Sequence, residues 1–138
     1  MLATLHRRQG IVMVKIVMLI KKRAGMSREA FMHHYDNVHV PLLHRLLSKG
    51  AAVHRRNFVV PQARDIGPGG NLDPNAGEDY DVICEVFYED RATAESVMQD
   101  FRDPQLRRLV EEDEARFVQP GSIKRYLVEV HETVFREL

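Results

Sequence analysis

Residues 11–21 carry hydrophobic side chains at both sets of alternating positions that a β-strand would present to its two faces. A strand with one solvated face alternates apolar and polar residues, whereas a strand covered on both faces is apolar throughout. The segment therefore predicts a strand that is covered on both faces. One set comprises Val14, Ile16, Met18 and Ile20, and the other comprises Val17 and Leu19.

The segment from Ser27 to near Gly50 predicts a helix. Serine is a preferred N-cap residue, and Met26 and Phe31 stand at the positions of a hydrophobic staple. At about 100° per residue, one narrow stripe of the helix is apolar and predicts its core-facing side. The stripe contains Phe31, Tyr35, Val38, Leu42 and Leu46.

The same patterns predict the remaining elements. They are a strand at 51–60, a strand at 80–88, a short helix from Asp90 or Thr93 to about Phe101, a helix at 104–118 and a strand at 123–130. The order strand, helix, strand, strand, helix, strand is that of the split βαβ unit. We therefore expect an α+β, ferredoxin-like βαββαβ domain, in which a four-stranded antiparallel sheet has helices on one face.

The length of 138 residues predicts one domain. We expect an N-terminal extension at 1–12, a ferredoxin-like domain at 13–131 and a C-terminal tail at 132–138. Residues 61–79 are rich in proline and glycine, which predicts a long irregular loop. Loops of this length often act as lids over a binding site, so 61–79 is a possible lid.

The second sheet face is the basis for a predicted homodimer. No further helix is predicted that would cover its apolar residues, and a second copy of the sheet is the simplest cover. Two such sheets can close into a dimeric α+β barrel with a cavity.

Composition narrows the classes of function. Lys and Arg number 20, as do Asp and Glu, and this balance argues against nucleic acid as the main partner. The single cysteine, Cys84, fits a reducing, cytoplasmic setting. The longest apolar run is too short to span a bilayer, so we expect no membrane partner.

Four of the seven histidines lie within residues 31–46, which raises the question of a metal site. No two of the four stand four residues apart, the spacing that lets one helix offer two ligands. Helical geometry instead scatters them, with His33 and His44 on the solvent face and His34 and His39 on opposite flanks of the apolar stripe. We therefore expect no metal site.

His39 differs from the other histidines because Pro41 follows it. Proline lacks an N–H and clashes with the carbonyl four residues earlier, and it disfavours helical dihedrals at Val40. The helix is expected to break or kink at 39–41, which would turn the imidazole into a cavity. There it would act as a proton acceptor and donor. The alternative is a structural histidine bonded to a freed carbonyl.

Tyr35, Asp113 and Cys84 are further candidates. Tyr35 lies one turn before His39, where it is either a core residue or a second group in the same pocket. Asp113 falls within the apolar stripe of the last helix, and a buried carboxylate needs a partner. Its partner would be an arginine or backbone group in the structural interpretation, and the histidine in the functional one. Cys84 is interpreted as a packing residue.

Two stretches of the chain resemble the EthD-domain family. The first is "VKIVMLIKKRAGMSREAFMHHYDNVHVPLL", with its Gly25–Met26–Ser27 turn, Phe31, and His39 shortly before Pro41. The second is "DEARF" at 113–117, which precedes the last predicted strand. The resemblance implies a dimeric α+β barrel and small-molecule metabolism without a bound cofactor. It also implies that His39 is the catalytic candidate.

EthD-type proteins are associated with oxidative degradation, lactone isomerisation, and dehydration or decarboxylation of polyketide-like aromatics. Our first hypothesis is a cofactor-independent enzyme in which His39 transfers a proton on a hydrophobic, oxygenated or aromatic metabolite. Tyr35 or Asp113 would orient it or the substrate. The alternatives are a non-catalytic carrier that assists an oxygenase, and a haem or metal barrel of similar shape.

Overall fold

The computed structural model describes residues 14–47, 50–60 and 80–137. The predicted extension at 1–12 and the possible lid at 61–79 lie outside these residues. The elements are, in chain order, β1 (Val14–Ile20), α1 (Arg28–His34), η1 (Tyr35–His39), α2 (Val40–Leu46), β2 (Val53–Phe58), β3 (Val82–Tyr88), α3 (Arg91–Asp100), α4 (Pro104–Phe117) and β4 (Lys124–Glu129).

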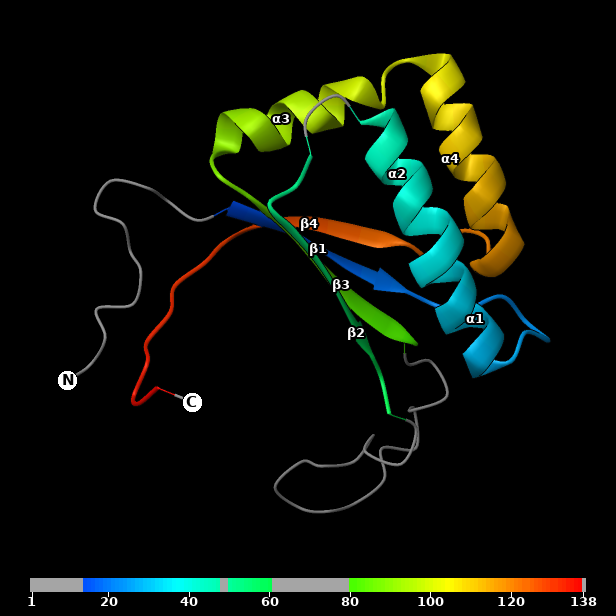
Figure 1. The fold of residues 1–138 in the computed structure, drawn as a ribbon, viewed down its shortest axis with the longest axis horizontal. Helices are drawn as coiled ribbons and strands as arrows, with labels where there is room; N and C mark the ends of the chain where they lie inside the picture. The colour runs from blue at the N-terminus through cyan, green and yellow to red at the C-terminus, as the bar shows by residue number, and fades with distance from the viewer. Residues whose placement is uncertain (1–13, 48–49, 61–79, 138) are drawn as a thin grey trace.

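The four strands form one antiparallel sheet in the order β2-β3-β1-β4, so the two strands at the centre are β1 and β3. The helices all lie on one face of this sheet (Figure 1). The predicted ferredoxin-like α+β fold and its four-stranded antiparallel sheet are therefore confirmed. None of the helices in the described part of the chain is long and apolar enough to cross a membrane.

Short polar side chains cap the starts of α1, α3 and α4. Ser27 accepts a hydrogen bond from the backbone N–H of Ala30 at 3.0 Å, as its N-cap role predicts. Asp90, rather than Thr93, caps α3 and accepts a bond from the N–H of residue 93 at 2.7 Å. Asp103 caps α4 in the same manner, and Pro104 occupies its first turn.

The predicted break or kink at 39–41 is wrong, because the irregularity of this helix is a π-helical turn. The backbone stays helical through Val40 (φ −60°, ψ −46°), and Figure 1 shows α1 and α2 as one continuous rod. The irregularity is the π-helical turn η1, in which the N–H of Val40 bonds to the carbonyl of Tyr35, five residues earlier. This wider turn directly precedes Pro41, whose ring would clash with the carbonyl of residue 37 in a regular α-helix.

The π turn also changes which side chains face the core. Phe31, Tyr35 and His39 are buried at a constant spacing of four residues, whereas Val38 is 43% exposed. The prediction that Val38 belongs to the core stripe is wrong, because it assumed the α-helical period throughout. The extra residue in the turn gives the inward position to His39 instead.

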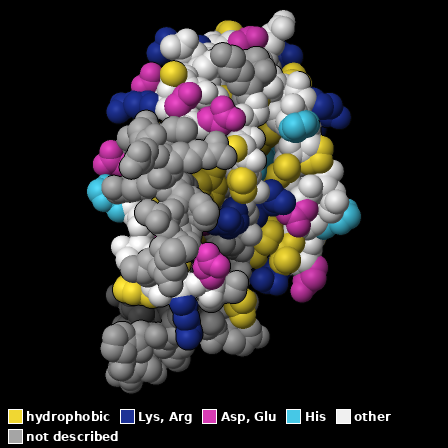
Figure 2. Space-filling model, turned by 60° about the vertical axis from the view of Figure 1, so that its left-hand side comes forward, with side chains coloured by type: hydrophobic (Ala, Val, Ile, Leu, Met, Phe, Trp, Pro, Cys, Tyr) yellow, Lys and Arg dark blue, Asp and Glu magenta, His cyan; other side chains and the backbone are white. Residues whose placement is uncertain are grey.

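The second face of the sheet carries both apolar and charged side chains. Lys15 and Glu85 form an ion pair of 2.5 Å at its centre, and the amide of Asn57 donates to Glu85 at 3.0 Å. Ile83 on β3 is 40% exposed and Tyr126 on β4 is 50% exposed. Figure 2 shows hydrophobic side chains interspersed with acidic and basic ones on the side turned to the viewer.

Candidate active site

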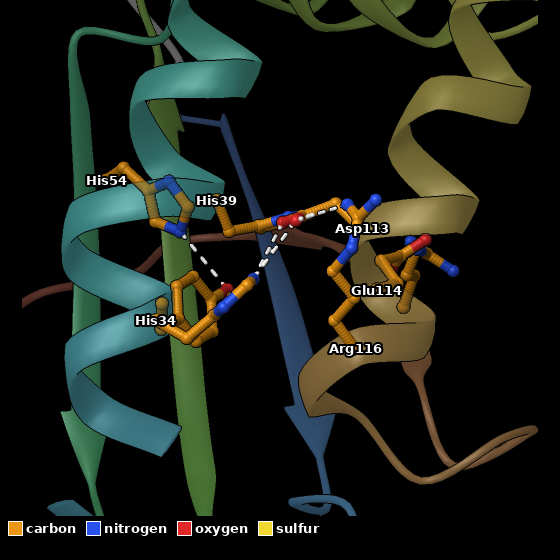
Figure 3. Close-up of polar contacts among 8 residues, drawn as sticks. His34, His39, His54, Asp113, Glu114 and Arg116 are labelled. Carbon is orange, nitrogen blue, oxygen red and sulfur yellow. Dashed lines mark hydrogen bonds and ion pairs between the residues drawn. The ribbon is translucent and has the colours of Figure 1, made fainter. Parts of the chain in front are cut away.

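His39 lies at the end of η1 and is 5% exposed. Its Nδ1 is 2.8 Å from Oδ2 of Asp113, which comes from α4 (Figure 3). An ionised carboxylate only accepts hydrogen bonds, so Nδ1 carries the proton and donates it to Asp113. The neutral ring consequently has its lone pair on Nε2.

Asp113 is 1% exposed, and it lies on the same side of α4 as Val110 and Phe117. The prediction that this carboxylate is buried is confirmed. Two further side chains bond to the carboxylate of Asp113. Nε2 of His34 lies 3.0 and 3.1 Å from its two oxygens, and Nη1 of Arg116 donates a hydrogen bond to it at 3.1 Å. Asp113 therefore contacts both an arginine and His39, the partners named in the two interpretations.

The charge state of this pair follows from its surroundings. Burial lowers the pKa of His39 below its ordinary value, and this effect outweighs the opposing hydrogen bond and charge of Asp113. Burial alone would raise the pKa of Asp113, but the hydrogen bond from His39, the charge of His34 and the bond from Arg116 hold it below the ordinary value. At neutral pH the pair is therefore a neutral imidazole beside a carboxylate.

A cavity of about 490 Å³ lies between the sheet and the helices. His39 lines it, and among the described residues Nε2 of His39 has no hydrogen-bond partner. Every buried side-chain nitrogen or oxygen in the described part of the chain has a partner, so Nε2 is in contact with the open space. Most of the lining is aliphatic or aromatic, and the lining residues come from all four strands and from η1, α2, α3 and α4.

A second polar group on the cavity wall is the pair Glu114 and Arg125. Nη2 of Arg125 donates to Oε2 of Glu114 at 3.2 Å. Burial raises the pKa of Glu114 despite the nearby positive charge of Arg125. Asp113 and Glu114 are thus neighbours on α4 with different surroundings (Figure 3). The carboxylate of Asp113 bonds to His39, whereas the carboxyl group of Glu114 lines the cavity.

Tyr35 lines the same cavity but does not bond to His39 or Asp113. Its hydroxyl lies 3.0 Å from Sγ of Cys84 and 3.5 Å from Nε2 of His54, and its ring contacts that of His39 edge-on at 5.6 Å. Burial and the neighbouring Cys84 raise the pKa of Tyr35 well above its ordinary value. The structure thus brings His39 and Asp113 together and places Tyr35 beside them with other partners.

Two histidines in this region were not singled out from the sequence. His34 was expected on a flank, but it stacks on Phe117 at 4.7 Å and bonds to Asp113. His54 lies on β2 and reaches the cavity and Tyr35. The alternation of side chains along β2 could have identified His54. His54 lies on the same face of this strand as Phe58, which packs against the core.

The described residues contain no group of three or more His, Cys, Asp or Glu side chains arranged to hold a metal ion. His34, His39 and Asp113 do meet, but both imidazoles use the nitrogen that faces Asp113 to donate a hydrogen bond.

Cys84 is fully buried, as its interpretation as a packing residue requires. Burial raises the pKa of its thiol to about 11, against weaker opposing effects of Tyr35 and Arg56. Two pKa units mean about 100-fold less thiolate at a given pH. We expect the native protein to react with dithionitrobenzoate at pH 8 at least about 100-fold more slowly than the guanidinium-unfolded chain. Equal rates would contradict the burial of this side chain.

The four-stranded antiparallel sheet with helices on one face places this protein in the class of ferredoxin-like α+β proteins. Sequence comparison then supplies the family, because residues 23–121 match the EthD domain model. The chain belongs to the EthD domain family, and the resemblance found in its sequence is confirmed. No curated protein sequence matches it significantly.

Three solved structures are similar to this chain, and the first of them shows the same fold. A crystal structure of an ethyl tert-butyl ether D family protein from Bacillus halodurans is 20% identical, covers 86% of this chain and 99% of its own, and superposes with a TM-score of 0.56. A dimeric protein of unknown function and ferredoxin-like fold from Bacteroides fragilis is 12% identical over 87% of this chain and 96% of its own, with a TM-score of 0.45. A hypothetical Arabidopsis thaliana protein is 17% identical over 90% and 91% of the two chains, with a TM-score of 0.47.

Proposed function

We propose that this protein is a cofactor-independent enzyme in which His39 transfers a proton on a hydrophobic, oxygenated or aromatic metabolite. The observation that carries the proposal is the orientation of one imidazole. Nδ1 of His39 is held by Asp113 at 2.8 Å, and Nε2 contacts the cavity without a partner among the described residues. A buried carboxylate that fixes the tautomer of a histidine is a recurrent arrangement for a general base.

The reaction class follows from what the site offers. Nε2 of His39 would take a proton from a carbon beside a carbonyl group, and the same nitrogen would return it. Return of the proton to another carbon gives isomerisation, and expulsion of a neighbouring hydroxyl gives dehydration. Loss of carbon dioxide from a carboxylate on that α-carbon would give the same enolate, which would take a proton from water by way of Nε2 of His39. None of these steps needs an electron donor or acceptor.

The cavity supports an apolar substrate of moderate size. A volume of about 490 Å³ lies within the ~300–1,000 Å³ of typical ligand pockets. Its few polar groups include His39, His54 and the Glu114–Arg125 pair, which leaves room for a small number of oxygens on an otherwise hydrophobic molecule.

Hydrogen exchange into simple ketones tests this proposal without knowledge of the natural substrate. We expect the protein to accelerate the uptake of deuterium from D₂O at the α-carbon of 2-tetralone or of the lactone 2-coumaranone, with saturation at high probe concentration. Mass spectrometry measures the uptake, and free imidazole at the same concentration provides the reference rate. Saturable binding with exchange no faster than this reference would favour the non-catalytic carrier instead.

We further propose that the second sheet face pairs with a second copy of the chain. In the described part of the chain, no helix covers this face, although it carries the exposed side chains of Ile83 and Tyr126 (Figure 1). Ile83 stands opposite Leu19, on the two central strands of the sheet. Burial of such residues against their symmetry mates would remove them from water.

Introducing a charge on a central strand of that face is expected to separate the copies. Ile83→Glu would convert a dimer into a monomer at micromolar concentration, measured by sedimentation or by light scattering after gel filtration. Val38→Glu is the matched control, since Val38 is equally exposed but lies on the helical layer. A wild-type monomer, or an Ile83→Glu dimer of unchanged affinity, would contradict the proposed pairing.

A further inference from the structure

His54 brings a second imidazole to the cavity from the opposite side of the core. It lies on β2, whereas His39 lies on the helical layer, and both line the same cavity (Figure 3). The ring of Tyr35 contacts both imidazoles edge-on, at 5.6 Å from His39 and 5.8 Å from His54 between ring centroids. The two histidines are therefore arranged around one aromatic ring and face the same space.

The hydroxyl of Tyr35 lies near Nε2 of His54, and this contact favours a ring proton on the other nitrogen. It lies between Sγ of Cys84 at 3.0 Å and Nε2 of His54 at 3.5 Å. A thiol is a weak donor and a weaker acceptor than an imidazole nitrogen. The favoured chain therefore runs from the thiol of Cys84 to the phenol oxygen, and from the phenol O–H to Nε2 of His54. The remaining proton of the ring then resides on Nδ1, which has no hydrogen-bond partner among the described residues.

The surroundings keep this imidazole neutral. Burial, together with the positive charge of Arg56, lowers the pKa of His54 to about 4. The guanidinium of Arg56 is held in place, because its Nε donates to Asp36 at 2.7 Å and its Nη1 donates to the backbone carbonyl of His54 at 3.0 Å. At neutral pH, His54 is thus an N–H donor without a positive charge.

We propose that Nδ1–H of His54 binds the carbonyl oxygen of the substrate while Nε2 of His39 removes the adjacent proton. The inference rests on the proposed function and specifies its substrate class as an enolisable carbonyl compound. When His39 takes the proton, the C–H electron pair forms the new C=C bond and the carbonyl electrons move onto oxygen. The hydrogen bond from His54 stabilises the resulting enolate, and the proton on His39 returns to carbon. A neutral imidazole serves as an electrophile of this kind in known isomerases.

The tautomer of His54 is measurable in the unmodified protein. In ¹⁵N-detected histidine spectra at pH 7, we expect the proton of His54 on Nδ1 and that of His39 also on Nδ1. The variant His54→Phe assigns the His54 signals. A His54 proton on Nε2 would overturn the proposal, because the ring would then donate to Tyr35 and present only a lone pair to the cavity.

A non-reacting ketone tests the contact itself. Benzophenone labelled with ¹³C at the carbonyl has no α-hydrogen, and its carbonyl resonance moves downfield when the oxygen accepts a hydrogen bond. We expect this shift in the wild type, its loss in His54→Phe, and partial recovery in His54→Gln, which restores an N–H donor. His39→Phe is expected to keep the shift. A full shift in a folded His54→Phe variant would overturn the assignment.

The two proposals fail in different ways. With 2-tetralone, His54→Phe is expected to lower kcat/KM for deuterium exchange by about 10²–10³-fold, as loss of one oxyanion donor does. A carbonyl shift that depends on His54 without any exchange would contradict proton transfer by His39 and leave the His54 contact in place. Exchange that depends on His39 but not on His54 would overturn only the role of His54.

Discussion

Replacing His39 with glutamine should lower the rate of deuterium exchange into 2-tetralone by about 10²–10⁴-fold, the usual contribution of a positioned general base. Glutamine has a similar reach and can still donate a hydrogen bond to Asp113, so the buried carboxylate keeps a partner. It has no basic nitrogen to place at the cavity. The expected loss is therefore in kcat, with a smaller change in the affinity for the ketone.

The matched control is His33→Gln, on the same helical rod. His33 is exposed, and its side chain hydrogen-bonds only to Asn37 among the described residues, so its replacement should leave exchange unchanged. Circular dichroism and the thermal midpoint would show that both variants are folded. Wild-type exchange rates in a folded His39→Gln variant would eliminate His39 as the base.

The pH profile supplies an independent readout for His39. Burial lowers its pKa below the ordinary 6.5, so the neutral, proton-accepting form persists below that pH. We expect kcat/KM for exchange to be constant from about pH 8 down to pH 6.5 and to fall only at lower pH. An onset of the fall above pH 6.5 would contradict the neutral state that the structure assigns to this ring.

The sequence predicted the fold well because its signals are local and regular. Apolar runs, each with a single charged residue, marked the central strands β1 and β3, and short polar caps marked the starts of α1, α3 and α4. The order of elements then left few topologies. Asp113 was also identifiable, since a carboxylate within an apolar stripe must be paired when the stripe is buried.

The details of the site depended on features that periodicity does not contain. The proline at 41 indicated an irregularity, but the chain resolves it with a π turn that keeps the helix intact and turns His39 inward in place of Val38. The contacts of His34 with Asp113 and of His54 with Tyr35 join segments 79 and 19 residues apart in the sequence. Such pairings arise from packing of the tertiary structure, which a single sequence does not display.

Asp113→Asn should reduce deuterium exchange about as strongly as the loss of His39 does, even though the substituted side chain would never touch the ketone. Its amide would present an N–H donor to Nδ1 of His39 and so move the ring proton to Nε2. The lone pair needed at the cavity would then be lost. We also expect the free energy of unfolding to fall by about 1–3 kcal/mol, because His34 and Arg116 would lose a charged acceptor in a buried setting.

A double-mutant cycle separates this indirect role from a general loss of stability. If Asp113 acts only by positioning His39, the double variant His39→Gln/Asp113→Asn should be no slower in exchange than His39→Gln alone. Glu112→Gln is the control on α4, since Glu112 is exposed and lies 3.6 Å from Arg108; its effect on stability should stay within about 0.5 kcal/mol. Additive losses in the double variant would show that Asp113 contributes to the reaction by a route that does not pass through His39.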